Sequence, residues 1–368
     1  MMAPKKCAGR QSRKKSRRKF SVKHQAAAER AVSYMIHTDN LTFNTVEKKG
    51  FKRLAQTLSQ GQFECKSRRT FGRLREKTVQ DVKRAFAEKL RNSGHFSLTT
   101  DACTLTKPKK SYLVVTGHIL DEKNACLVGM EFPPILANKS HTSESICQLV
   151  NMLLEEFKIR KEKISAITTD SAANMILAAS LLKLDHVPCL NHKLHLAVMK
   201  SIEDCDSLKP TVQLLKSLSA FFNRSPAASN MLIEVQKENG VEERSQLLLV
   251  ISCETRWNNI CDMVERYLIL NQHVTEVMER LGNPHELPDE EKLVDLDDCF
   301  TFLKPCKEVT VLLSGSSYPT SSITIPTCRN LQHALTTMIP STLTGGQFKQ
   351  HLLRNLNLIL KKSTPIKY

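Results

Sequence analysis

Two aspartates lie at the ends of predicted β-strands, and paired carboxylates have a well-defined chemistry. Asp101 directly follows Phe96–Thr100, in which apolar and β-prone polar residues alternate, and Asp170 closes a second apolar segment, 164–168. We expect these strands to be neighbours, which would bring both carboxylates to one edge of a sheet. Hard oxygen ligands hold Mg²⁺, and two such ions can activate a water in phosphodiester cleavage. The alternative interpretation is that each Asp caps a helix or lies in solvent.

Basic residues are concentrated near the N-terminus. The chain has 54 Lys and Arg against 37 Asp and Glu, a net charge of +17, and residues 1–24 hold ten of the basic residues and no acidic one. The densest run consists of Arg13, Lys14, Lys15, Arg17, Arg18 and Lys19. Such a run cannot bury itself and is typical of a solvated, disordered tail. It predicts a nuclear import signal or an arm that contacts nucleic-acid phosphates, and a plain solvating tail is the remaining interpretation.

The elements that would position the two aspartates follow an order typical of a ribonuclease-H-like fold. Three β-prone runs come first, followed by a helix, a fourth strand, a helix, a short fifth strand and another helix. We place them at 96–100, 112–116, 126–130, 146–157, 164–168, 172–182, 187–190 and from 191 onward. The sequence therefore predicts the α/β class with a ribonuclease-H-like core, in which Thr142 or Ser143 caps the first helix.

Helical patterns fill the rest of the chain. Apolar spacing predicts helices over Ala26–Ile36, Thr45–Ser59 and Val79–Leu90, with a polar break at Phe63–Thr70, and the chain is predicted helical again from about Ser201. We therefore expect a basic disordered tail (1–24), an N-terminal helical region (25–92), a ribonuclease-H-like catalytic-type core (93–200) and an all-α domain (201–368).

Five short motifs in a fixed order make the chain resemble the hAT-superfamily transposases. They include two Asp motifs, a Cys-x-x-His helix start and a Thr-Arg-Trp-Asn block, and they lie at 96–101, 167–174, 188–197, 253–259 and 313–325. The segment Val46–Leu54 is similar to the region upstream of the family's catalytic core. The match spans about residues 30–330, and the pattern is most similar to domesticated proteins of the BED-finger type.

The resemblance implies a fold, a chemistry and a set of site residues. The family's ribonuclease-H-like core is interrupted by a large all-α insertion, and it uses two Asp and a distal Glu with Mg²⁺ or Mn²⁺ to cut and join DNA ends. Asp101 and Asp170 match the two Asp. Arg256 and Trp257 match a pair placed near DNA ends, where Trp can stack on a displaced base and Arg can meet phosphate.

The chain departs from the family pattern in two places. The family's third acid lies in a Ser-Ala-x-Ser-Glu-Arg-type segment within its C-terminal dimerisation region, and the 368 residues contain no such segment. The family's zinc-based BED finger has no counterpart either, since residues 1–95 contain only Cys7 and Cys65. We therefore expect a core that is incomplete at its C-terminal side, a truncated all-α insertion, and weak or no strand transfer, because two carboxylates fix a second metal ion poorly.

Several candidate residues also have ordinary structural interpretations. By resemblance, Cys189 and His192 support the active-site region, and with His186 and His195 they recur every third residue, which raises a zinc interpretation. Four ligands at helical spacing cannot close a tetrahedron around one ion. We therefore expect a core cysteine, locally bonded histidines and no zinc site. Without the family match, Trp257 would be predicted in a core.

The sequence lacks the apolar segments of a membrane or secreted protein. No apolar run approaches the roughly 18 residues of a membrane span, and no apolar stretch follows the basic N-terminus as in a secretory signal. The twelve Cys form no Cys-x-x-Cys pair, which indicates reduced thiols.

Three functional hypotheses follow from these features. The first is a domesticated, transposon-derived nuclear protein that binds DNA or acts as a transcription-related interaction module, without being a complete enzyme. The second is a metal-dependent transposase or nuclease that uses Asp101 and Asp170 with Mg²⁺ or Mn²⁺. The third is a truncated product with only a protein partner or a second copy of itself, in which an apolar surface is left exposed.

Overall fold

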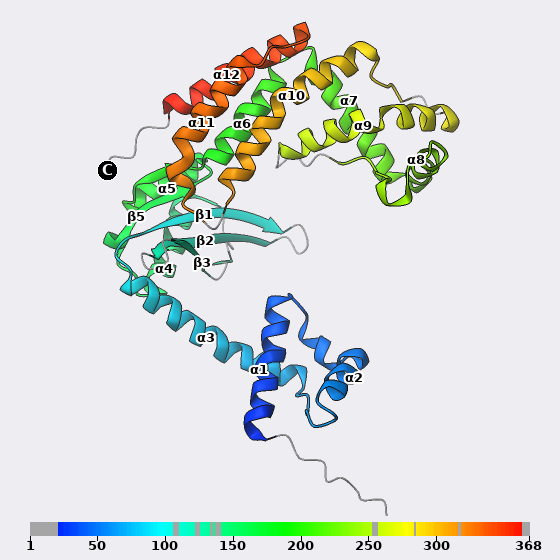
Figure 1. Ribbon diagram of the computed structural model, residues 1–368. Coiled ribbons are helices and arrows are strands. Elements are labelled where there is room, and N and C mark those ends of the chain that lie inside the picture. The colour runs from blue at the N-terminus through cyan, green and yellow to red at the C-terminus, as the bar shows by residue number, and fades with distance from the viewer. Residues whose placement is uncertain are drawn as a thin grey trace, which may run out of the picture. The chain divides into compact units, whose positions relative to one another are not determined.

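The computed structural model describes residues 21–105, 110–121, 126–132, 135–136, 141–251, 257–282, 285–315 and 318–362. The chain divides into two compact units, Met1–Asn92 and Ser93–Tyr368 (Figure 1). The second unit combines a β-sheet with helices, which confirms the predicted α/β class. No described helix is long and apolar enough to cross a membrane.

The first unit has a small core. Its elements are α1 (Val22–Thr38), the 3₁₀ helix η1 (Phe43–Glu47), α2 (Lys49–Leu58) and α3 (Arg68–Asn92). Ile36, Val46 and Phe71 form the fully buried cluster, with one side chain each from α1, η1 and α3. Farther along α3, every residue from 75 to 82 is exposed. The unit is therefore stabilised by few buried contacts.

The boundaries of these helices correct two expectations. The helix expected over Thr45–Ser59 is split, because Lys48 adopts an extended backbone (φ −69°, ψ 141°) between η1 and α2. The polar break expected over Phe63–Thr70 is shorter than predicted. α3 begins at Arg68, whose backbone N–H donates to the Glu47 carboxylate at 3.1 Å. That long-range cap has no local sequence signal.

The sheet of the second unit is mixed. Its strands are β1 (Phe96–Leu105), β2 (Lys110–Asp121), β3 (Cys126–Glu131), β4 (Ile135–Leu136), β5 (Ile164–Thr169) and β6 (His186–Pro188). The order is β3-β2-β1-β5-β6, with β4 paired to β2. The β1–β2 and β2–β3 pairs are antiparallel, whereas β5 runs parallel to β1 and β6 runs parallel to β5.

Alternation along β1 separates the two faces of this sheet. Phe96 and Leu98 are buried on one face, while Ser97 and Thr99 are half-buried on the other. Helices α4 (Ser143–Glu156) and α5 (Ala173–Leu182) pack against each other, and the η2 turn (Lys161–Lys163) leads into β5. Thr142 is the N-cap of α4, as predicted, and its side chain accepts the Ser145 N–H.

The chain is helical after β6, as predicted for the residues described beyond Ser201. The elements are α6 (Leu190–Glu203), α7 (Leu208–Arg224), α8 (Pro226–Glu238), η3 (Glu243–Ser245), α9 (Asn258–Leu281), α10 (Glu290–Leu313), α11 (Thr320–Thr337) and α12 (Leu343–Lys362). Helices α6, α10, α11 and α12 lie side by side (Figure 1). One continuous core of apolar side chains runs through these helices from Leu194 to Leu356.

A buried carboxylate joins α10 to the start of α12. Asp298, 6% exposed, accepts hydrogen bonds from the N–H groups of Ser341 and Thr342, both at 2.9 Å, and from the Thr342 hydroxyl at 3.1 Å. A Cβ atom added to Gly345 would overlap this carboxylate. The junction therefore requires glycine at position 345.

Candidate functional site at the carboxyl edge of the sheet

The strand register brings the two predicted acidic residues to the same edge of the sheet. In the parallel β1–β5 pair, Thr99 lies beside Thr168. Each acid comes two residues later: Asp101 lies within β1, which continues to Leu105, and Asp170 lies one residue past the end of β5. Because neighbouring strands lie about 4.8 Å apart, the two acids follow paired positions on adjacent strands.

The loop after β5 holds Asp170 in a defined position. Its Oδ1 accepts the backbone N–H of Ala172 at 3.0 Å, across Ser171, which has a left-handed φ of 67°. The Thr169 hydroxyl accepts the Ser171 N–H at 3.1 Å. Asp170 thus caps the turn before α5 with one oxygen, which is the structural alternative that the sequence left open for it.

Asp101 is held less firmly. Its side chain is exposed, and its Oδ1 accepts the N–H of the adjacent Ala102 at 2.8 Å. The two carboxylates supply oxygen ligands of the kind that Mg²⁺ and Mn²⁺ prefer. Within the described segments, no group of three or more His, Cys, Asp or Glu side chains is arranged to hold a metal ion. The edge therefore offers two oxygen ligands, and a third protein ligand is not identified.

Two histidines, which sequence reasoning did not place beside these strands, bond to threonines near the acids. His118 on β2 shares a 3.1 Å hydrogen bond with Thr99, and His186 on β6 shares one of 2.9 Å with Thr169. Burial lowers the pKa of His118. Burial also lowers the pKa of His186, Lys193 lowers it further, and Asp170 acts in the opposite direction. Both imidazoles are therefore neutral at pH 7.

The start of α6 connects the sheet to the helical region. Cys189 is half-buried, and its backbone N–H donates to the Thr169 carbonyl at 2.8 Å, which extends the β5–β6 pairing into the helix. Two residues later, Asn191 donates through its side-chain amide to the Ser314 hydroxyl at 3.0 Å, next to the end of α10. The Cys-x-x-His motif thus lies where the sheet, α6 and α10 converge.

His195, and not His192, makes the direct contact with the Trp257 segment. The Trp257 N–H donates to His195 Nδ1 at 3.3 Å, and the His192 and His195 rings are 6.0 Å apart. Burial first, and then His192, lowers the pKa of His195. A neutral His195 is required because only an unprotonated Nδ1 can accept this hydrogen bond. In the sequence, the only sign of a role for His195 was its place in the series of His and Cys at every third residue.

Trp257 lies in the core of the helical region. Its side chain is 2% exposed and belongs to the same apolar cluster as Leu194 and Ile260. This is the core position that the sequence also allowed, and an indole in this position is not available to stack on a base. The base-stacking role stays a prediction that requires Trp257 to leave this core.

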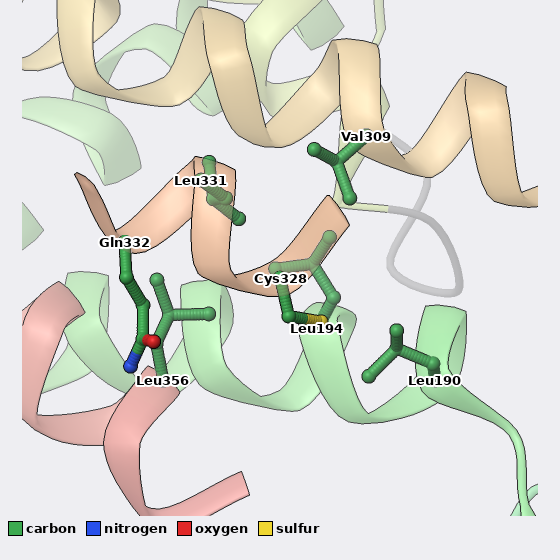
Figure 2. Close-up of a pocket in the computed structure, with 7 residues that line it drawn as sticks. All are labelled: Leu190, Leu194, Val309, Cys328, Leu331, Gln332 and Leu356. Carbon is green, nitrogen blue, oxygen red and sulfur yellow. The ribbon is translucent and has the colours of Figure 1, made fainter. Parts of the chain in front are cut away.

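A small apolar pocket lies between α6, α10, α11 and α12 (Figure 2). Six of its seven lining side chains are apolar or cysteine, and the seventh, Gln332, donates to Asn357 Oδ1 at 2.5 Å. Burial raises the pKa of the lining Cys328 thiol to about 11. A thiol with that pKa stays protonated at pH 7 and is a poor nucleophile. The pocket therefore lacks groups for acid–base or nucleophilic chemistry.

The two units differ in net charge. Residues 21–92 carry sixteen Lys and Arg against seven Asp and Glu, whereas residues 93–368 carry 29 against 30. The basic side chains at Lys49, Lys52 and Arg53 on α2 are exposed, as are Arg69 and Arg73 on α3. The first unit therefore presents a basic surface of described residues. Its signal, the excess of Lys and Arg after residue 24, was present in the sequence but was not singled out.

Some predicted DNA contacts lie outside the described residues. Arg256 falls in the gap at 252–256, and the basic run Arg13, Lys14, Lys15, Arg17, Arg18 and Lys19 precedes residue 21. Their roles stay predictions from the sequence.

Comparison with known proteins identifies a distant relative. No protein-family model matches the chain. A protein of Talaromyces stipitatus named "Putative transcriptional regulator tpeD" is 24% identical over 332 residues. The alignment covers 79% of this chain and 38% of that protein, so the chain spans less than half the length of the relative that it matches.

Proposed function

We propose that this chain is a domesticated hAT-transposase derivative that binds DNA in the nucleus and acts as a binding or transcription-related module, without a complete transposase active site. The basic surface of residues 21–92 and the basic tail contact the phosphates, and the second unit serves as the scaffold. The electrostatic part of such binding is independent of sequence and falls with salt.

The arrangement of the sheet supports the transposase origin. Three antiparallel strands followed by two parallel strands, in the order β3-β2-β1-β5-β6, are what a ribonuclease-H-like core would have. Asp101 in β1 and Asp170 directly after β5 each come two residues after the paired Thr99 and Thr168, which agrees with the places of the first two acids in the resemblance. The helical region that follows corresponds in this proposal to the family's all-α insertion.

The distant relative supports the regulatory part of the proposal. Its name describes a transcriptional regulator, and the alignment extends over 79% of this chain. Since only 38% of that protein is matched, the regulatory role of the whole relative comes to this chain as a proposal.

The observation that best supports DNA binding is the difference in net charge between the two units. Sixteen basic and seven acidic residues in 21–92 stand against a balanced 29 and 30 in 93–368. Excess positive charge on one unit and balanced charge on the other is the pattern expected when one part of a chain attracts nucleic acid and the other does not.

A salt titration of the full chain with a fluorescent DNA duplex tests the proposal. We compare the wild type with a triple variant of the exposed α2 residues, Lys49→Gln, Lys52→Gln and Arg53→Gln. Each lost phosphate contact reduces the slope of log K against log salt by about 0.9, so we expect a reduction of up to about 2.7. A second variant replaces the six basic residues of the run at 13–19 by Gln.

The matched control removes the same charge from the second unit. Lys237→Gln, Lys304→Gln and Arg329→Gln are exposed positions on α8, α10 and α11. We expect this variant to bind DNA with the wild-type slope. Binding that is insensitive to salt, or equally weakened by both triple variants, contradicts the proposal.

A second candidate function rests on the acid pair. The positions of Asp101 and Asp170, each two residues after a paired threonine, favour metal-dependent DNA cleavage as the alternative. Incubation of the full chain with supercoiled plasmid and Mn²⁺, beside Asp101→Asn, separates the two functions. Nicking that disappears in the variant supports the enzyme, whereas nicking that persists in the variant, or no nicking at all, argues against it.

A further inference from the structure

Ser21 stands at the junction of the basic N-terminal segment and the first helix. Its side chain is exposed, and its backbone is extended, with φ −62° and ψ 153°. As the N-cap of α1, its hydroxyl oxygen accepts the His24 N–H at 3.2 Å. The same hydroxyl bonds to His24 Nδ1 at 2.8 Å, so Ser21 is an exposed residue on extended backbone whose local hydrogen bonds are to the first turn of α1.

The charged residues around Ser21 are all basic. Arg18 precedes it by three positions, Lys19 precedes it by two, and Lys23 follows it by two. No acidic residue occurs before Glu29. A cleft lined with carboxylates would recognise this pattern, since Arg pairs with carboxylates through strong charge-assisted hydrogen bonds.

The structure distinguishes Ser21 from similar hydroxyls. Among the described residues, three Ser or Thr side chains have Arg three positions earlier: Ser21, Ser33 and Thr78. Ser33 is half-buried within α1, and Thr78 lies within α3, where its hydroxyl donates to the Leu74 carbonyl at 2.9 Å. Only Ser21 combines the basic pattern with a non-helical backbone.

We propose that Ser21 is a phosphorylation site for a serine/threonine protein kinase that recognises basic residues. The Ser21 oxygen attacks the γ-phosphorus of Mg-ATP, an O–P bond forms, and the bond from that phosphorus to the bridging β–γ oxygen breaks. ADP leaves, and the hydroxyl proton passes to the kinase's general base and then to water.

The phosphate has two consequences at this position. α1 has no acidic residue in its first turn, so a phosphate there places negative charge at the helix N-terminus, where the dipole favours it. It also adds a charge of about −1.5 to −2 to a segment that carries ten basic residues and no acid. The second consequence weakens DNA binding, and this part rests on the proposed function.

The experiment treats the full chain with Mg-ATP and a purified kinase of this specificity, and maps the phosphate by mass spectrometry. We compare the wild type with Ser21→Ala, Ser33→Ala and Arg18→Gln. We expect phosphate on Ser21 in the wild type and in Ser33→Ala, its loss in Ser21→Ala, and at least a tenfold slower reaction in Arg18→Gln. Hydrogen exchange in residues 22–30 should slow after the reaction, because the helix start is stabilised.

The outcomes separate this proposal from the proposed function. Phosphate on Ser33 or Thr78, or only on Ser12 or Ser16, overturns the assignment, as does a rate unchanged by Arg18→Gln. We expect phosphorylation to reduce the slope of log K against log salt by up to about 2. An unchanged slope refutes the effect on DNA binding but leaves the phosphorylation site assigned. Failure of the unphosphorylated chain to bind DNA refutes the proposed function alone.

Discussion

Residues 21–92 and residues 93–368 differ in net charge and in the size of their buried cores. The first unit is strongly basic and has a small buried cluster, Ile36, Val46 and Phe71, with eight consecutive exposed residues in α3. The second is electrically balanced and has a continuous helical core next to its sheet. Burial stabilises a fold in proportion to apolar area. The second unit therefore has the larger stabilising core, whereas the first unit carries the excess positive charge.

A practical consequence is that the two units can be observed separately. Trp257 is the single tryptophan of the chain and is buried in the second unit, so its fluorescence reports only on that unit. Helical circular dichroism reports on both.

The largest expected effect comes from removing a buried aromatic side chain from the small core of the first unit. Phe71→Ala removes a fully buried side chain that packs with Ile36 and Val46, and such a change costs about 3–5 kcal/mol. Since a small unit has little stability to lose, we expect residues 21–92 to unfold. The measurement is thermal circular dichroism beside Trp257 fluorescence. A simultaneous shift of both signals would contradict the independence of the two units.

The next effect tests the α10–α12 junction within the second unit. Gly345→Ala places a Cβ atom on the Asp298 carboxylate, which then loses its partners, and we expect a cost of about 3 kcal/mol. Urea unfolding followed through Trp257 measures it.

Gly346 is the matched control for that substitution. A Cβ atom there would meet Pro340 at 3.7 Å, an ordinary contact, and Ala in a helix is preferred to Gly by roughly 0.5–1 kcal/mol. Gly346→Ala should therefore be neutral or stabilising. Equal losses in the two variants would show that the carboxylate contact is not the cause.

A smaller effect concerns pH, and it belongs to the second unit. Burial lowers the pKa of His118 and of His195 in the folded state, whereas unfolded His titrates near pH 6.5. Below about pH 6.5 the unfolded chain therefore binds more protons, so the free energy of unfolding falls as the pH falls. Urea unfolding at pH 7.5 and 5.5, followed through Trp257, measures this. The double variant His118→Gln, His195→Gln should show a shallower dependence, and an unchanged one would exclude these two groups.

The smallest effect is expected at the acid edge. Asp101 is exposed, and Asn can still accept the Ala102 N–H, so Asp101→Asn should change stability by less than about 0.5 kcal/mol. If the pair binds Mn²⁺, the ion should raise the unfolding temperature of the wild type and not of the variant. The same shift in both proteins would show that Mn²⁺ binds elsewhere.

Local patterns were sufficient for much of the sheet and its neighbours. The alternation at Phe96–Thr100 and the polar cap at Thr142 are signals carried by adjacent residues, and the structure confirms both elements. The neighbouring positions of β1 and β5 were also predictable from the element order. The end of β1 was not: the strand was expected to stop before Asp101, but its pairing with β2 continues to Leu105.

Contacts between distant residues were not accessible to the same reasoning. The bond from Trp257 to His195 spans 62 positions, and the Glu47 carboxylate that caps α3 is 21 positions from Arg68. Neither partner has a local pattern that identifies the other. Sequence periodicity describes which face of an element is apolar, but it does not tell which other element covers that face.

The edge strand β6 has a consequence for how copies of the chain meet. It is the last strand of the described sheet on its side, it has only three residues, His186–Pro188, and its proline lacks an N–H. A strand from another molecule needs a row of free backbone groups to extend a sheet, and a short, proline-containing edge offers few. Growth of the sheet from one molecule into the next is therefore disfavoured at this side, which limits polymerisation of the protein through its β-strands at high concentration.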